Sequence, residues 1–144
     1  MKNNKAGFTL IELLVVIAII GLLSTLSVLA LNSARARARD AKRVADVRQI
    51  QTALEMYYND AGTYPTGSVA SGTAITYGSS TYMRAVPSAP LIADGACGIS
   101  QDYTYEFRSV GGVTGGSYTL KYCLGMSVNE LPAGLNTATP AGMK

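Results

Sequence analysis

The sequence predicts an α+β protein, in which a long N-terminal α-helix packs its C-terminal half on a small antiparallel β-sheet head. Two observations indicate this fold class. Residues 8–60 combine an apolar run with an amphipathic pattern of helical period. Residues 61–144 hold 13 of the 15 glycines and all five prolines, which favour turns between short strands. We therefore expect a membrane helix at 8–31, an amphipathic continuation at 32–60 and a β-rich head at 61–144.

The apolar run at 8–31 is long enough to cross a bilayer. Of its 24 residues, 18 are apolar, and as a helix it measures about 36 Å against a hydrocarbon core of about 30 Å. A buried core helix and a cleaved secretory signal are the alternatives. The head is too rich in small residues to bury such a helix, and a signal normally has an apolar region of only about 7 to 15 residues.

Glu12 lies inside this apolar run and has no cation beside it. A charge at this depth costs about 2.5–3.5 kcal/mol at mid-bilayer and less near an end. The nearest charged side chain is Lys5, seven positions back. A cut just before Phe8 would create an α-amino group four residues from Glu12, which it could meet within the chain or across a contact with a second copy. A protonated or snorkelling carboxyl is the alternative.

The chain enters the apolar run through the residues Ala6, Gly7, Phe8, Thr9, Leu10, Ile11 and Glu12, and an unbroken apolar helix follows. This segment resembles the cleavage and methylation motif of type IV pilins and of the pseudopilins of type II secretion. The resemblance implies a leader at 1–7, cleavage after Gly7 by a prepilin peptidase and N-methylation of Phe8. It also implies that Glu12 pairs with the N-terminus of a neighbouring subunit during assembly.

Residues 52–65 are also similar to this family, at the point where the long helix meets the head. The family implies a helical homopolymer of this chain, a single-pass precursor in the lipid bilayer, an inner-membrane assembly platform and a final place in a cell-surface or periplasmic filament. A pilus subunit is the first expectation. A pseudopilin of a secretion or DNA-uptake system and a membrane-tethered monomeric binding module are the alternatives. Many type IVa pilins have a proline where this chain has Leu29.

Composition argues against an enzyme. The chain has no histidine, which removes histidine general bases and imidazole metal ligands. The glycine-rich residues 111–116 lack the Lys-Ser/Thr of a phosphate-binding loop and are interpreted as a turn. We therefore expect no catalytic residue, no bound metal and no cofactor.

Beyond residue 31 the apolar side chains form one stripe of the helix. They are Val44, Val47, Ile50, Leu54 and Tyr57. This stripe needs a cover, which the sheet can supply. Helical spacing also predicts weak pairs, which are Arg37 with Asp40, Lys42 with Asp46, and Gln51 with Glu55. Gly62 suits a left-handed cap at the helix end, and Pro65 forbids continuation.

Five basic residues follow the apolar run. They are Arg35, Arg37, Arg39, Lys42 and Arg43. No aromatic residue is interleaved to stack on bases, so we expect a solvated or lipid-headgroup face and no DNA contact. Only two lysines precede the run, and the positive-inside rule alone would place the head in the cytoplasm. The cleavage motif implies the opposite orientation, which we adopt.

In the head, residues 103–108 and 118–124 alternate with period two and predict two strands joined by a connection at 109–117. Tyr103, Tyr105 and Phe107 are expected to face the core. Residues 66–92 are expected to be loop with one short strand or helix. Residues 131–144 are expected to be a partly ordered, loop-rich tail.

Cys97 and Cys123 are the only cysteines. An even count in an exported head predicts a structural disulfide, with free thiols or redox and metal chemistry as alternatives. Carboxylates are scattered over the head as Asp94, Asp102, Glu106 and Glu130. Asp94 and Asp102 could contribute to a calcium site resembling that of major pseudopilins. Solvated loop charge is the favoured interpretation.

Overall fold

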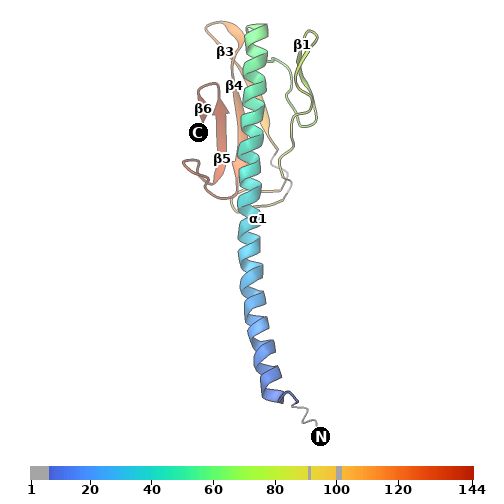
Figure 1. Cartoon of the computed structure of the whole chain (residues 1–144). Coiled ribbons are helices and arrows are strands. Elements are labelled where there is room, and N and C mark those ends of the chain that lie inside the picture. Colours follow the sequence, from blue (N-terminus) through green and yellow to red (C-terminus); the bar gives the residue numbers. More distant parts are fainter. Residues whose placement is uncertain (1–6, 91, 100–101) are drawn as a thin grey trace. The chain divides into compact units, whose positions relative to one another are not determined.

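The computed structural model describes residues 7–90, 92–99 and 102–144. Helix α1 (Leu10–Ala61) is followed by strands β1 (Ile75–Tyr77), β2 (Ser80–Met83), β3 (Thr104–Val110), β4 (Val113–Leu124), β5 (Gly134–Thr139) and β6 (Gly142–Met143) (Figure 1). The chain divides into two compact units, one ending at Arg35 and one covering Ala36–Lys144. The α+β class with a long N-terminal helix is confirmed.

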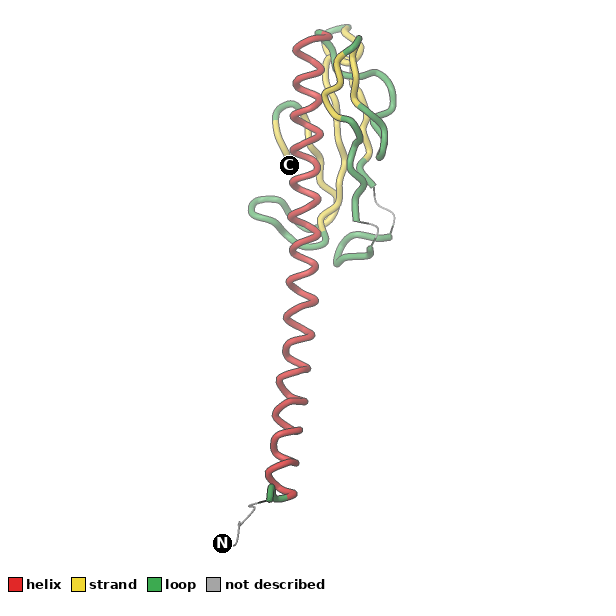
Figure 2. The backbone as a smooth tube through the Cα atoms, turned by 45° about the vertical axis from the view of Figure 1, so that its right-hand side comes forward, coloured by secondary structure: helices red, strands yellow, loops and turns green. Residues whose placement is uncertain are grey.

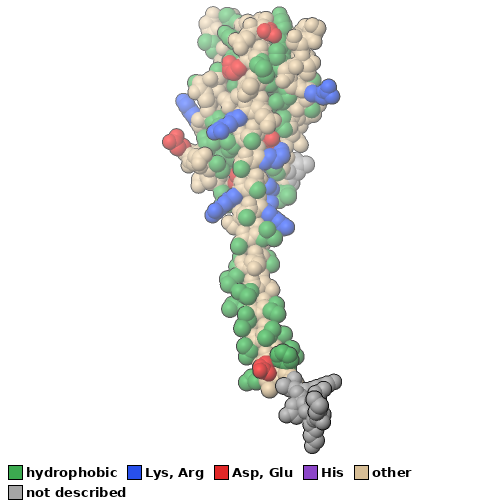
Figure 3. Space-filling view, viewed as in Figure 1, with side chains coloured by type: hydrophobic (Ala, Val, Ile, Leu, Met, Phe, Trp, Pro, Cys, Tyr) green, Lys and Arg blue, Asp and Glu red, His purple; other side chains and the backbone are tan. Residues whose placement is uncertain are grey.

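The first unit presents the apolar half of α1. All its described residues are exposed, and an 18-residue window has a mean hydropathy of 2.8 with none of its surface buried. Hydrophobic side chains cover this part of the helix (Figure 3). The hydroxyls of Thr25 and Ser27 donate to the carbonyls of Leu22 and Leu23, both at 2.8 Å. By length and composition the helix can cross a membrane, and these internal bonds satisfy the hydroxyls of Thr25 and Ser27 there.

The second unit packs the rest of α1 against an antiparallel sheet of order β3-β4-β5-β6 (Figure 2). The predicted stripe is confirmed, because Val44, Val47, Ile50 and Leu54 are buried and Tyr57 packs against them. The sheet contributes its largest buried side chains from β4, namely Tyr118, Leu120, Tyr122 and Leu124. Alternation along β4 thus supplies the cover that the helix stripe requires.

The turn between β3 and β4 is shorter than predicted. Only Gly111 and Gly112 form it, with φ of 60° and 81°, as two-residue hairpins favour. Residues 113–117, expected in the connection, belong to β4. Gly115 is required there because a Cβ would lie 2.6 Å from the carbonyl oxygen of Tyr64, whose N–H donates to Gly115 at 2.7 Å.

Phe107 does not enter the core, contrary to expectation, and is 43% exposed. It pairs in register with Tyr118. The ring of Tyr118 is already covered by Tyr64 and Tyr105, at centroid distances of 4.8 and 5.9 Å. Phe107 is therefore left at the margin of edge strand β3, while Tyr103 is buried and Tyr105 is half-buried.

The segment at 66–92 contains a hairpin of two short strands between Ile75 and Met83, where one short element was expected. β1 and β2 pair antiparallel around a turn in which Gly78 has a φ of 58°. Ile75 is buried, whereas Tyr77 is exposed. Strands of three and four residues are too short for a clear alternating pattern in the sequence.

The expected tail at 131–144 is wrong, because most of it completes the sheet. β5 pairs with β4 from Leu120–Ala138 to Leu124–Gly134. Asn136 and Ala138 are buried, whereas Leu135, next to Asn136 on the opposite face of β5, is 69% exposed. The backbone of Lys144 exchanges two hydrogen bonds with Thr137, at 2.8 and 2.9 Å, which fixes the end of the chain.

Candidate functional site

The first candidate site is the N-terminal end of α1, where Thr9 and Glu12 form a capping box. The N–H and hydroxyl of Thr9 both donate to Oε2 of Glu12, at 2.8 and 2.7 Å. In return the N–H of Glu12 donates to Oγ1 of Thr9 at 3.3 Å. The Thr-x-x-Glu spacing is the sequence signal for this arrangement, and the sequence reasoning missed it. It also explains why α1 begins at Leu10 and not at Phe8.

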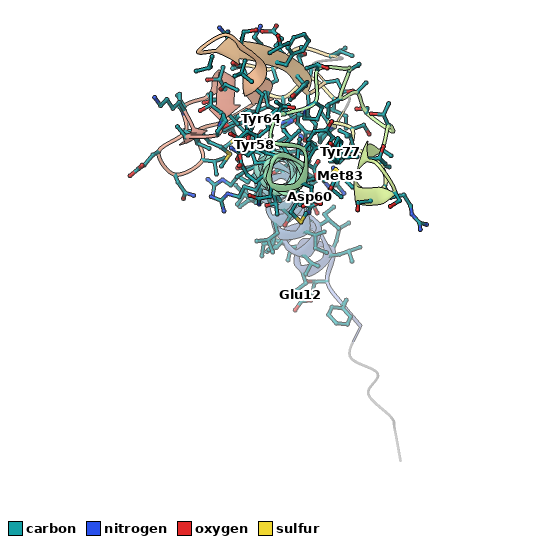
Figure 4. All side chains as sticks on the ribbon, turned by 90° about the horizontal axis from the view of Figure 1, so that it is seen from above. Glu12, Tyr58, Asp60, Tyr64, Tyr77 and Met83 are labelled. Carbon is teal, nitrogen blue, oxygen red and sulfur yellow. A yellow bond between two sulfur atoms is a disulfide. The ribbon has the colours of Figure 1, made fainter. Side chains whose placement is uncertain are left out.

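Glu12 is the only acidic residue in the first turn of α1 (Figure 4). The free N–H groups of the first turn and the helix dipole favour a negative charge there. Within the described part of the chain, no lysine or arginine side chain pairs with Glu12, and its Oε1 accepts no hydrogen bond. One carboxylate oxygen therefore remains open to a donor from another molecule.

Gly7 and Phe8 precede this cap in non-helical backbone, and both are exposed. The Phe8 side chain is 91% exposed. The peptide bond between Gly7 and Phe8 therefore lies in accessible, non-helical backbone next to a well-defined helix start. Gly7, Phe8 and Glu12 therefore lie in one short segment at the start of α1.

A second polar cluster lies in the head, around the buried Asp40 of α1. Asp40 has no exposed surface. Its carboxylate accepts from Arg43 at 2.7 Å and from the N–H groups of Gly125 and Met126 at 2.8 and 2.9 Å. Arg43, which is 3% exposed, also donates to Asp94 at 3.0 Å. One guanidinium therefore bridges two buried carboxylates.

Arg39 also binds Asp94, through Nε at 2.6 Å and through Nη2. The hydrogen bond from Arg39 is the main reason that the pKa of Asp94 is lowered. A solvated or lipid-headgroup face was expected for the basic run. The structure differs, because Arg39 and Arg43 bind Asp94 inside the head. The predicted pair of Arg37 with Asp40 is also wrong, because Asp40 takes Arg43 one turn later.

Of the remaining predicted pairs, one is present and one is not. Lys42 pairs with Asp46 at 2.5 Å. Gln51 and Glu55 instead find separate partners, because Gln51 donates to the Thr139 carbonyl at 3.0 Å and Glu55 accepts from Tyr64 at 2.9 Å. These partners come from distant segments, which spacing within the helix cannot indicate.

Cys97 and Cys123 form the predicted disulfide, with their Cα atoms 5.8 Å apart. It ties the segment at 92–99 to β4. Asp94 and Cys97 exchange backbone hydrogen bonds at 3.0 and 2.7 Å. The disulfide and the Asp94 ion pairs therefore fasten the same loop, one to the sheet and the other to α1.

Asp94 and Asp102 do not share a site. Asp102 accepts from the N–H groups of Ala89 and Tyr103, at 3.0 and 2.8 Å, and from the hydroxyl of Ser71. Asp94 is bound by two guanidiniums and is only 5% exposed, so it is not solvated loop charge either. A calcium ion at Asp94 would have to displace two arginines. Among the described residues, no group of three or more carboxylate, cysteine or histidine side chains is placed to hold a metal.

Tyrosines gather at the C-terminal end of α1 (Figure 4). Tyr58 stacks on Tyr64 with centroids 4.7 Å apart, and Tyr57 contacts Tyr77 of the β1–β2 hairpin at 5.4 Å. The end of the helix is closed by Gly62, as predicted, with a φ of 71° and a hydrogen bond to the Tyr58 carbonyl at 2.8 Å. This cluster attaches the hairpin to α1.

Comparison with known proteins points to the same N-terminal segment. A family model described as the prokaryotic N-terminal methylation motif matches residues 2–28. The chain is 42% identical to the type II secretion system core protein G of Aeromonas hydrophila over 45% of its own length and 46% of that protein. The chain therefore covers less than half the length of this relative. No solved structure matches the chain at comparable significance.

Two other relatives are matched over more of their length. The chain is 32% identical to the type II secretion system core protein G of Dickeya chrysanthemi over 65% of its own length and 68% of that protein. It is 33% identical to the fimbrial protein EcpC of Eikenella corrodens over 84% of its own length and 76% of that protein. Together with the methylation motif and the long helix with its antiparallel sheet, these matches show that the chain belongs to the type IV pilin and pseudopilin family.

Proposed function

We propose that this chain is the structural subunit of a type IV pilus-like filament, cut after Gly7, methylated on Phe8 and assembled through its N-terminal helix. The observation that carries the proposal is an exposed apolar helix whose first turn holds Glu12, an acid without a cationic partner in the described residues. A subunit of this kind is a building element and not an enzyme.

Before assembly, the bilayer surrounds residues 8–31 and the leader faces the cytoplasm. The bond between Gly7 and Phe8 then lies at the membrane surface in non-helical backbone, where a membrane-bound prepilin peptidase can reach it. Cleavage removes Lys2 and Lys5 and creates the Phe8 amine. A positive amine thus appears within one helical turn of the carboxylate.

During assembly, the open Oε1 of Glu12 accepts the Phe8 amine of a neighbouring copy. Oε2 can keep both hydrogen bonds from Thr9, at 2.7 and 2.8 Å, while this happens. The cap therefore holds the carboxylate in place for the incoming amine, and the pair neutralises two charges in an apolar environment. An inner-membrane assembly platform brings the copies together.

In the filament, the apolar helices exchange lipid for contacts with one another, which van der Waals packing stabilises. The heads remain outside this core, each closed by its own sheet and disulfide. The subunit thus passes from a single-pass membrane protein to a cell-surface or periplasmic filament.

A second candidate is a pseudopilin of a type II secretion or DNA-uptake system. Two of the three relatives described above favour it, since both are named type II secretion system core protein G. The pilus subunit is preferred because the match to fimbrial protein EcpC extends over 84% of the chain. The arginines on Asp94 support this preference, because Asp94 is one of the two carboxylates that could contribute to a calcium site resembling that of major pseudopilins, and both its oxygens are already paired.

The proposal is tested by intact mass and electron microscopy in cells that contain the peptidase and the assembly platform. Membrane-derived protein is expected to lack residues 1–7 and to carry one added methyl group. Sheared surface material is expected to contain filaments only when this chain is present. A protein starting at Leu31 would indicate a secretory signal, and a processed chain that stays monomeric would indicate a membrane-tethered binding module. Loss of secretion without surface filaments would favour the pseudopilin.

A further inference from the structure

The basic run behind the apolar helix separates into two groups. Three of its members bind aspartates: Arg39 with Asp94, Lys42 with Asp46, and Arg43 with Asp40 and Asp94. Arg35 and Arg37 are exposed. All nine aspartates and glutamates of the sequence lie in the described residues, and none of them pairs with Arg35 or Arg37. The two unneutralised arginines are the two nearest the apolar run.

Their position along α1 matches the headgroup layer of a bilayer. Arg35 and Arg37 follow Leu31, the last residue of the apolar run, by four and six positions, or about 6 and 9 Å of helix. The polar layer on each side of the hydrocarbon core is about 5–8 Å thick. Helical side chains lean toward the N-terminus, here toward the membrane. Both guanidiniums can therefore reach lipid phosphates.

We propose that Arg35 and Arg37 bind the phosphates of anionic lipid headgroups on the side of the membrane where the head emerges. This inference rests on the proposed function, because it requires residues 8–31 to span the bilayer. Guanidinium groups match phosphate with paired N–H donors. Each basic residue near an anionic membrane surface strengthens the binding to that surface about fivefold.

The arrangement of the two arginines favours lipid over a single macromolecular partner. Residues two positions apart project about 200° apart around an α-helix, so Arg35 and Arg37 point to nearly opposite sides. One nucleic acid or protein surface would meet only one of them, whereas a headgroup layer surrounds the helix and meets both. No aromatic residue lies between them to stack on a base.

The test uses the full chain in nanodiscs of equal phosphatidylglycerol and phosphatidylcholine, with retained lipids counted by native mass spectrometry. The variant R35Q/R37Q is compared with R48Q/R84Q, which removes two exposed arginines that also lack a carboxylate partner among the described residues. Lys2 and Lys5 are present in every sample, so the differences report only the substituted residues. We expect R35Q/R37Q to lower phosphatidylglycerol enrichment at least about threefold and R48Q/R84Q to leave it unchanged.

The proposal would be overturned if phosphatidylglycerol enrichment were equal in the unsubstituted chain and in both variants. It would also be overturned if both variants lost this enrichment equally. A third contradicting result would be that R35Q/R37Q loses oligonucleotide binding, measured by fluorescence anisotropy, while its phosphatidylglycerol enrichment does not change. Carbonate extraction of the same proteins from membranes separates this inference from the proposed function. A chain that is extracted does not span the bilayer, whereas an integrated chain without lipid preference contradicts only the inference about Arg35 and Arg37.

Discussion

Replacing Arg43 by methionine tests the buried ion pairs that fasten α1 to the head. The substitution keeps most of the side-chain volume but removes the guanidinium between Asp40 and Asp94. Breaking a buried pair from one side costs about 3–5 kcal/mol. Asp40 keeps two backbone donors and Asp94 keeps Arg39, so we expect the lower end, about 3 kcal/mol.

For a domain of this size, about 3 kcal/mol corresponds to a fall in Tm of about 12 °C. All nine tyrosines lie between Tyr57 and Tyr122, so the tyrosine signal in near-ultraviolet circular dichroism of the full chain in detergent reports on the head and on the end of α1 that packs against it. R48M is the control, because Arg48 is exposed and forms no ion pair within the described residues. A fall in Tm no larger for R43M than for R48M would refute the reasoning.

Three further predictions concern the same loop. Because the hydrogen bond from Arg39 holds the pKa of Asp94 below its ordinary value, the stabilisation from this group is present above pH about 4 and is lost as pH falls through the lowered pKa. D94N is therefore expected to reduce stability at pH 7 and to flatten the acid limb of a Tm–pH curve, and an unchanged acid limb would contradict this. Excess EDTA or added calcium is expected to move the Tm of the head by less than about 1 °C, since two arginines already neutralise Asp94; a rise of several degrees with calcium would contradict the arrangement. Reducing the bond between Cys97 and Cys123, which are 26 positions apart, is expected to destabilise the head by about 2–4 kcal/mol in urea unfolding. Two alkylated thiols in the native, unreduced protein would show that the bond is absent.

Features that depend on neighbouring residues could be predicted from the sequence. The stripe from Val44 to Tyr57 and the Gly62 cap follow from helical period and from glycine's freedom at positive φ. The Thr9–Glu12 cap is equally local. Its signal is the Thr-x-x-Glu spacing, which is less prominent in the sequence than the isolated charge of Glu12.

Apart from the disulfide, which the count of two cysteines indicates, the contacts between distant residues could not be predicted. Arg39 and Asp94 are 55 positions apart, and no period or spacing connects them. β5 was expected to be part of a tail because its strand character depends on pairing with β4, which buries Ala138 and Asn136. Phe107 has the correct alternation for a core residue, yet Tyr64, which comes from the loop after α1, covers Tyr118 in its place.

In the proposed function, Glu12 drives assembly through its charge and not only through its cap. Glutamine at this position can retain both hydrogen bonds from Thr9 but carries no charge. The variant T9A does the opposite, because it keeps the charge of Glu12 and loses the cap, which costs the helix about 1 kcal/mol. Filaments sheared from cells expressing E12Q, E12A or T9A are counted by electron microscopy, with removal of residues 1–7 confirmed by intact mass. The account predicts that E12Q abolishes filaments as completely as E12A, that both are still processed, and that T9A retains filaments. Normal filaments from E12Q would contradict the claim and leave Glu12 with a capping role only.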